Sequence, residues 1–254
     1  MIFYFTGTGN SLYIAQKLAD KFDTRLVSIK EATHSSNYNF QLEKNEILGI
    51  VVPVYYMGLP NIVNNFLKNL TLSGNPKTTF AIVTFGGMAG NAVDNIENLL
   101  FNKNIKTNYK LDLRMPENYV VYYNPPSKVG QEEIFQNAEI ELSSFIKALS
   151  EENPSFYNNN KNLITKIASK IFYSLYNLST KTQKFYSTEK CIGCKICAQI
   201  CPSKAIVMEN NRPRWIKNTC EKCSACINRC PHGAVEYGKS TIKRNRYVNP
   251  LVKF

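Results

Sequence analysis

The sequence has 254 residues, enough for one or two domains, and its formal net charge of +12 at pH 7 corresponds to a pI of about 9.2. A basic balance favours acidic partners, but none of the usual nucleic-acid-binding motifs is present, so we do not expect nucleic acid as a partner. No stretch approaches the roughly 18 uninterrupted apolar residues of a membrane span, and Met1 leads straight into Ile2 and Phe3 without the basic leader of a signal peptide. We therefore expect a cytoplasmic protein without a transmembrane segment.

The first stretch of the chain has the pattern of a phosphate site. Residues 2–5 are β-formers, and from Leu12 onward apolar residues recur at helical spacing. Between them lies the loop Thr6-Gly7-Thr8-Gly9-Asn10-Ser11. A strand, a glycine-rich turn and a helix place an anion on the helix N-terminus. The loop has no lysine for a Walker A motif, and Leu12 occupies the third glycine position of a dinucleotide fingerprint. The remaining option is a loop of hydroxyls and amides that holds a phosphate without a cation.

Further strands and helices alternate along the next 140 residues or so. Strands are predicted at about 24–29, 46–54, 79–85 and 106–114, and helices at about 61–70, 91–101 and 128–149. This order predicts a parallel sheet covered on both faces, with ligands at the carboxyl ends of its strands. The loops 6–11, 55–60 and 86–90 all lie at those ends.

The loop after the first strand resembles the Thr/Ser-x-Thr-Gly-x-Thr/Ser loop with which flavodoxins hold the phosphate of FMN. The resemblance implies an α/β fold over residues 1–150, a flavodoxin-like five-stranded parallel sheet in the order 2-1-3-4-5. It also implies an FMN site built from three loops. Its residues are Thr6, Gly7, Thr8, Gly9, Asn10, Ser11, Tyr55, Tyr56, Met57, Gly58, Phe85, Gly86, Gly87 and Met88.

Two features of the flavin loops bear on the resemblance, one that supports it and one that departs from it. The pair Met57-Gly58 is similar to the Met-Gly of clostridial flavodoxins, whose glycine peptide turns toward flavin N5, and a glycine tolerates that turn because it has no Cβ. Many flavodoxins carry an aromatic residue where this chain has Met88, so the outer flavin face is either more open or covered by another segment. The tyrosine-rich loop 115–123 is a candidate cover, with Tyr119 as the added site residue; the alternative is an ordinary connection.

A linker with an amphipathic helix is predicted at 151–186. Residues 151–162 are polar and indicate a domain boundary. A helix follows at about 161–178, with apolar pairs four residues apart. The pairs are Leu163/Ile164, Ile167/Ala168, Ile171/Phe172 and Leu175/Tyr176. Packing of this stripe between the two domains is favoured over a position on a membrane surface, because apolar stripes usually face protein.

All eight cysteines occur in two runs with the spacing C-x2-C-x2-C-x3-C-P. Disulfide frameworks suit short secreted chains, and structural zinc with four ligands leaves the extra cysteine of each run without a purpose. The spacing is that of bacterial two-cluster ferredoxins, in which the fourth cysteine of each run ligates the other [4Fe–4S] cluster. The expected ligand sets are Cys191, Cys194, Cys197 and Cys230 for one cluster, and Cys220, Cys223, Cys226 and Cys201 for the other.

The segment around the cysteines is an internal repeat, since residues 202–206 recur in similar form at 231–235. We assign residues 187–239 to a small α+β ferredoxin domain of the bacterial two-cluster type. His232 is expected near a cluster. Residues 240–254 form a basic C-terminal tail, for which a solvated conformation is the default expectation and docking of an acidic redox protein the alternative.

The two resemblances together point to an iron–sulfur flavoprotein, or fused ferredoxin, of the kind found in anaerobes. Clusters pass one electron each and a flavin one or two. The expected function is therefore electron transfer between two [4Fe–4S] clusters and FMN within one chain, with a redox protein as partner. The alternative is a flavin-dependent reductase of a small organic substrate such as a quinone, nitro compound or enone. A third possibility, a redox sensor, needs an effector segment, and only the basic tail is available.

Overall fold

The computed structural model describes residues 1–153 and 163–254. The domain boundary predicted at 151–162 lies largely outside these described residues and stays a prediction.

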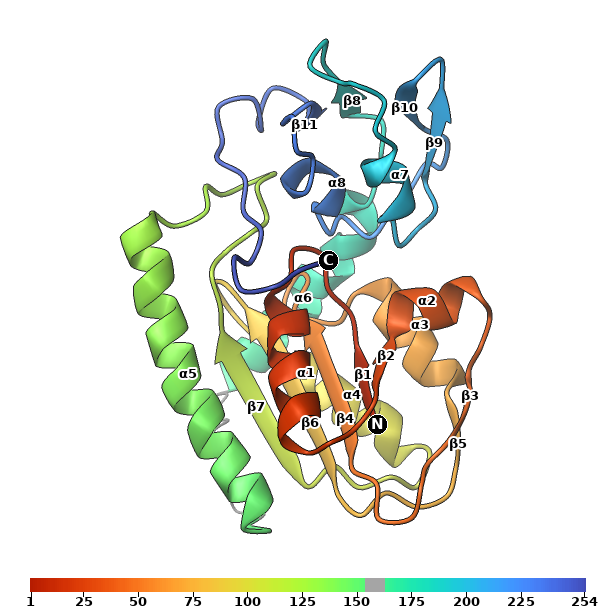
Figure 1. Cartoon of the computed structure of the whole chain (residues 1–254), viewed down its shortest axis with the longest axis vertical. Helices are drawn as coiled ribbons and strands as arrows, with labels where there is room; N and C mark the ends of the chain where they lie inside the picture. Colours follow the sequence, from red (N-terminus) through yellow and green to blue (C-terminus); the bar gives the residue numbers. More distant parts are fainter. Residues whose placement is uncertain (154–162) are drawn as a thin grey trace.

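A five-stranded parallel sheet forms the centre of the N-terminal part (Figure 1). Its order is β2 (Leu26–Ser28), β1 (Ile2–Tyr4), β4 (Leu48–Pro53), β6 (Thr79–Phe85) and β7 (Tyr109–Arg114). In terms of these strands alone the order is 2-1-3-4-5, which confirms the predicted flavodoxin-like topology. The central strands are continuous apolar runs because both faces of the sheet are covered; β4, for example, is buried from Leu48 to Val52.

Helices form a layer on each face of the sheet. They are α1 (Asn10–Lys21), α2 (Ile29–His34), α3 (Asn61–Asn69), α4 (Ala92–Phe101) and α5 (Lys128–Ser150). α1 and α5 cover one face, where Ile14, Leu18 and Phe145 are fully buried. The other three helices cover the opposite face, with Phe66 and Ile96 at its centre.

A short parallel pair, β3 (Asn39–Gln41) and β5 (Thr71–Ser73), was not predicted. Each strand has one apolar residue, Phe40 or Leu72, between polar neighbours, and both pack against the second helix layer. Three-residue strands with one apolar side chain are too short for a periodicity to be read from sequence.

The cysteine-bearing part lies over the carboxyl edge of the sheet (Figure 1). Its elements are β8 (Phe185–Ser187), α7 (Ile196–Gln199), β9 (Ile206–Glu209), β10 (Arg212–Trp215), α8 (Ala225–Asn228) and β11 (Val235–Tyr237). The strands form two antiparallel pairs, β9 with β10 and β8 with β11. Ile206, Ile227 and Val235 share a small buried core with several cysteines. This is the small α+β unit predicted for the ferredoxin domain.

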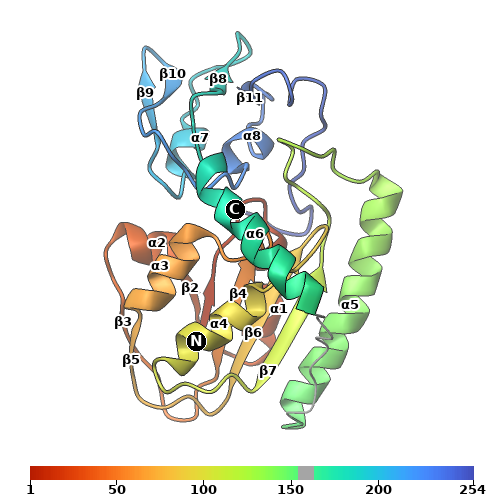
Figure 2. The ribbon, with the colours of Figure 1, turned by 180° about the vertical axis from the view of Figure 1, so that it is seen from behind.

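The helix α6 (Leu163–Ser179) runs from the sheet to the cysteine-bearing part (Figure 2). The Tyr173 hydroxyl donates to the Leu59 carbonyl oxygen at 2.8 Å, and the Tyr176 hydroxyl to Glu221 Oε2 at 2.9 Å. The helix therefore contacts both parts. Of the predicted stripe, Tyr176 is buried at 1% exposed, but Ile171 is 60% exposed, so only part of the stripe faces protein. Within the part of the chain that the structure describes, no helix has the length and apolar character to cross a membrane.

The segment after β11 returns to the sheet and ends near the start of α1 (Figure 1). We refer to its residues 244–254 as the strap. Tyr247 and Asn249 are 2% and 1% exposed. The Asn249 backbone N–H donates to the Thr8 carbonyl oxygen at 2.8 Å. The expectation of a solvated tail is wrong for these residues, because they supply hydrogen-bond partners to the phosphate loop.

Candidate cofactor sites

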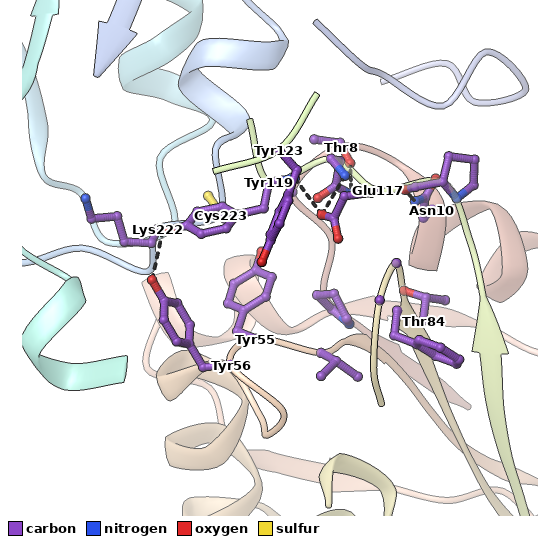
Figure 3. A pocket seen from close by; sticks show the side chains of 18 of the residues that line it. Thr8, Asn10, Tyr55, Tyr56, Thr84, Glu117, Tyr119, Tyr123, Lys222 and Cys223 are labelled. Atoms are coloured by element: carbon purple, nitrogen blue, oxygen red, sulfur yellow. Dashed lines mark hydrogen bonds between the residues drawn. The ribbon is translucent and has the colours of Figure 1, made fainter. Parts of the chain in front are cut away.

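The carboxyl ends of β1, β4, β6 and β7 surround a cavity of about 600 Å³ (Figure 3). Its lining comes from loop 6–11, the ends of β4 and β6, segment 116–124, α6 and residues 221–223. Of the residues predicted from sequence for the FMN site, all except Gly9 and Gly58 line this cavity.

The N-terminus of α1 offers a place for a phosphate. The helix begins after Gly9, whose φ of 107° lies in the left-handed region that glycine adopts without strain. No side chain among the described residues caps the first amides of α1, and such amides attract an anion. Thr6 Oγ1 accepts a hydrogen bond from the Gly9 N–H at 2.9 Å, and Ser11 Oγ lies 2.8 Å from Thr84 Oγ1. The amides and hydroxyls present fit a phosphate monoester such as that of FMN.

Asn10 differs from its expected role. Its Nδ2 donates to the Pro116 carbonyl oxygen at 3.0 Å. Its Oδ1 accepts from the Tyr247 hydroxyl at 2.6 Å and from Asn249 Nδ2 at 3.2 Å. The side chain therefore ties the strap to the phosphate loop, and only the backbone N–H of Asn10 is left to face an anion.

The loop after β4 forms a tight turn. Tyr55 and Gly58 exchange two backbone hydrogen bonds of 2.9 Å, and the two residues between them, Tyr56 and Met57, have φ values of 51° and 62°. Left-handed non-glycine residues are strained and concentrate at functional sites. The left-handed conformation lies at Tyr56 and Met57 and not at Gly58, and a turn of the Gly58 peptide toward a flavin stays a prediction. Gly58 is required for a different reason, since a Cβ there would lie 2.3 Å from the Tyr173 ring.

Tyrosines from three segments meet at one end of the cavity. The Tyr119 hydroxyl lies 3.0 Å from the Tyr56 hydroxyl, and the Tyr56 ring stacks on that of Tyr176 with 5.3 Å between centroids. Burial, and then the hydrogen bond with Tyr56, raises the pKa of Tyr119, so its hydroxyl is protonated at neutral pH and can donate. Tyr122 and Met88 also line the cavity but are 57% and 60% exposed, so this side is open to solvent.

Glu117 is a site residue that the sequence did not reveal. Its Oε1 accepts hydrogen bonds from the backbone N–H groups of Asn118 at 2.9 Å and Tyr119 at 2.8 Å. A Cβ on Gly86 would lie 2.4 Å from Glu117 Oε2. The carboxylate therefore holds segment 116–119 over the end of β6 and adds negative charge to the cavity wall. Its position just after the fifth strand was the one available signal.

Residues 221–223 bring the cysteine-bearing part against the phosphate loop. A Cβ on Gly7 would lie 2.7 Å from the Cys223 carbonyl oxygen, so only glycine allows this approach. The neighbouring Glu221 accepts hydrogen bonds from Tyr176 and from the first two backbone N–H groups of α3. Burial raises the pKa of Glu221, and these hydrogen bonds oppose the rise. Glu221 therefore anchors the ferredoxin-like part on both α3 and α6.

The eight cysteines are free thiols that fall into two groups. One small cavity is lined by Cys191, Cys194, Cys197 and Cys230, and another by Cys201, Cys220, Cys223 and Cys226. This is the grouping predicted from the spacing, and His232 lines the first cavity. Among the described residues, no group of three or more His, Cys, Asp or Glu is arranged to hold a single metal ion.

Backbone amides also point at cysteine sulfurs. The Ala205 N–H donates to Cys201 Sγ and the Ala234 N–H to Cys230 Sγ, both at 3.3 Å. The backbone N–H of the residue before Cys223 donates to Cys220 Sγ at 3.4 Å. Such hydrogen bonds stabilise thiolates and tune cluster potentials. Four thiols in each of two separate groups, with amides directed at their sulfurs, form a donor set that fits iron–sulfur cubanes.

A second contact between the two parts involves His34, to which the sequence assigned no role. His34 Nε2 lies 2.9 Å from the Pro202 carbonyl oxygen, next to Cys201 in the chain. The Lys204 Nζ donates to the His34 carbonyl oxygen at 3.4 Å. No local pattern could have indicated this contact, because it joins residues about 170 positions apart.

Two protein families match the chain. The flavodoxin domain family matches residues 1–120, and the 4Fe-4S dicluster domain family matches residues 190–235. No curated protein gives a significant match.

Solved structures with some similarity include a flavoprotein from Bacteroides uniformis, with 18% identity, a TM-score of 0.34, and 45% of this chain and 88% of that chain covered. A flavodoxin from Streptococcus pneumoniae TIGR4 has 17% identity, a TM-score of 0.39, and coverage of 59% and 97%. Rubredoxin oxygen:oxidoreductase from the anaerobe Desulfovibrio gigas has 17% identity, a TM-score of 0.35, and coverage of 59% and 35%.

The sheet order, the phosphate loop, the eight cysteines and both family matches agree. The chain joins a flavodoxin domain, which implies FMN, to a 4Fe-4S dicluster ferredoxin domain, and it is an electron-transfer flavoprotein.

Proposed function

We propose that the protein relays electrons within one chain between two [4Fe–4S] clusters and FMN, and so couples a low-potential one-electron donor protein to a one- or two-electron acceptor. The observation that carries this proposal is that Cys223 lines both the second cysteine cavity and the flavin cavity (Figure 3). When bound, the clusters supply one-electron transfer and FMN supplies one- or two-electron transfer. We place this activity in the cytoplasm, where thiols stay reduced.

The proposed ligands follow the two cavities. Cys191, Cys194, Cys197 and Cys230 would hold the outer cluster, and Cys201, Cys220, Cys223 and Cys226 the inner cluster. The amides and hydroxyls of loop 6–11 would hold the FMN phosphate. Residues 55–57, 85–88 and Tyr119 would surround the ring.

The chain's own contribution to the relay is to hold its two parts in one fixed arrangement. The contact at Gly7 brings the backbone of Cys223 against the phosphate loop. Glu221 and the strap anchor this contact from two sides. A docked arrangement of this kind removes the search step that a free ferredoxin and a free flavodoxin must make before electron transfer.

Anaerobic stopped-flow reduction tests the proposal. The holoprotein, with about eight irons and one FMN per chain, is mixed with less than one electron equivalent of a reductant that reacts with clusters. The relay predicts that the clusters are reduced first and FMN afterwards, at a rate independent of protein concentration. A rate proportional to protein concentration would show transfer between molecules and overturn the proposal, and zinc in place of iron would overturn its cofactor basis.

A second candidate is reduction of a small organic substrate at the flavin. The open side of the cavity favours it, because Tyr119 presents a protonated hydroxyl there beside the exposed Tyr122 and Met88. Steady-state assays with a quinone, a nitroaromatic compound and an enone, each with the wild type and Tyr119→Phe, test this candidate. Saturable turnover that falls in the variant, with unchanged FMN content, would support it; turnover equal to that of free FMN would exclude it.

A further inference from the structure

Lys222 is a buried cation between two proposed ligands of the inner cluster, Cys220 and Cys223. The residue is only 3% exposed to solvent. The Nζ lies 3.5 Å from the centroid of the Tyr237 ring and 4.9 Å from that of Phe185. Two aromatic rings stabilise an ammonium group without neutralising its charge. The charge is thus retained in a region from which water is excluded.

Lys222 lines both the flavin cavity and the cavity of the inner cysteine set. Figure 3 shows its side chain extending from the flavin cavity toward the ferredoxin side. The adjacent Glu221 also lines the cavity of the inner set, and its carboxylate accepts hydrogen bonds from Tyr176 and the amides of α3.

The outer cysteine set has no equivalent buried charge among the described residues. Gly193 occupies the matching position in the first run, and both residues share a left-handed backbone, with φ values of 74° and 52° for Gly193 and Lys222. Lys195 and His232 line the outer cavity, but both are exposed, so water and salt screen them. The two halves of the repeat therefore have similar backbones, but only the second places charged residues inside the protein beside its cysteines, the half-buried Glu221 and the buried Lys222.

We propose that Lys222 raises the reduction potential of the inner cluster above that of the outer cluster and so gives electron flow a direction, from the outer set to the inner set and then to FMN. A positive charge in a low-dielectric environment favours the more negative, reduced state of its neighbour. The inner set is the one next to FMN, because Cys223 lines the flavin cavity and no cysteine of the outer set does so. Each step transfers one electron, and no covalent bond forms or breaks. The inference rests on the proposed relay.

The test is an anaerobic redox titration of the holoprotein, followed by EPR. The wild type should show two cluster potentials. Lys222→Met keeps the length of the side chain and its contact with the rings but removes the charge. One potential should become more negative by at least about 59 mV, which corresponds to a tenfold change in equilibrium constant for a one-electron couple. The other potential should stay unchanged. Lys222→Arg should keep the wild-type value, and Lys195→Met is the matched control for an exposed lysine beside the outer set.

Unchanged potentials in Lys222→Met with full iron content would overturn the inference, as would an equal shift of both clusters. Lys222→Gln serves as a second neutral variant if the methionine variant does not assemble. If both neutral variants fail to hold iron while Lys222→Arg assembles normally, the charge is needed for cluster assembly. This outcome would also overturn the inference. The relay fails in a different way: two distinct, Lys222-dependent potentials without reduction of FMN would overturn the relay and leave the role of Lys222 in place.

Discussion

The approach of two loops at Gly7 leads to a quantitative prediction. In Gly7→Ala the added Cβ would lie 2.7 Å from the Cys223 carbonyl oxygen and 3.3 Å from the Tyr55 hydroxyl oxygen. Cys223 cannot move away cheaply, because the neighbouring Glu221 is anchored on Tyr176. Overpacking of this kind costs about 1–3 kcal/mol. If the cost falls on the contact between the two domains, the ratio of docked to undocked molecules should fall about 5- to 150-fold.

Hydrogen exchange at residues 221–223 of the anaerobic holoprotein measures this ratio, and the cluster-to-FMN transfer rate is measured in parallel. We expect faster exchange and slower transfer in Gly7→Ala. The control is Gly130→Ala in α5, where the nearest atoms, in Pro126 and Ser127, lie at 3.5 Å from the added Cβ and make ordinary contacts. Wild-type exchange and transfer in Gly7→Ala, at normal iron and FMN content, would refute the close docking on which the relay proposal depends.

Three other changes have defined outcomes. Tyr247→Phe removes the hydroxyl that donates a hydrogen bond to Asn10, which costs about 1 kcal/mol. FMN binding should weaken about fivefold in a fluorescence titration, at unchanged iron content. Unchanged affinity would show that the strap does not contribute to FMN binding. Cys201→Ser should remove the inner cluster and about half of the iron but leave FMN in place, so full iron content would contradict the ligand assignment. Burial alone would raise the pKa of Glu46, but hydrogen bonds, first from Arg25, lower it to about 2. Glu46→Gln should therefore reduce the free energy of unfolding, measured in urea at pH 7, by about 2 kcal/mol. Because the folded-state pKa is depressed from its usual 4.5, this difference should be complete above about pH 4.5 and decline toward pH 2. A difference independent of pH would exclude the ion pair of Glu46 with Arg25, 3.2 Å apart, as its source.

The features predicted correctly from sequence all depend on short-range patterns. The strands β4 and β6 are continuous apolar runs, and the alternation of strands and helices predicts a parallel sheet, whose order was implied by the resemblance to flavodoxins. The phosphate loop is one contiguous motif. The grouping of the cysteines follows from their spacing, since three ligands two residues apart wrap one cluster and leave the fourth for the other.

The features that were missed or wrong depend on long-range contacts. Periodicity places Ile171, Leu175 and Tyr176 in one apolar stripe of α6, but it does not tell which side of that stripe meets the protein. Here Tyr173 and Tyr176 face inward, because their hydroxyls find partners at Leu59 and Glu221. The same limitation applies to the strap, whose partners in loop 6–11 are some 240 positions away in the chain.

The strap also sets an order of events during synthesis. Asn10 is made 239 residues before Asn249, a delay of about 12–48 s at 5–20 residues per second. During that interval the central sheet can form, but the phosphate loop lacks the partners that hold Asn10 and Thr8. Both cysteine runs leave the ribosome before the strap does. The phosphate loop therefore acquires its last hydrogen-bond partners only after both cysteine runs have been made.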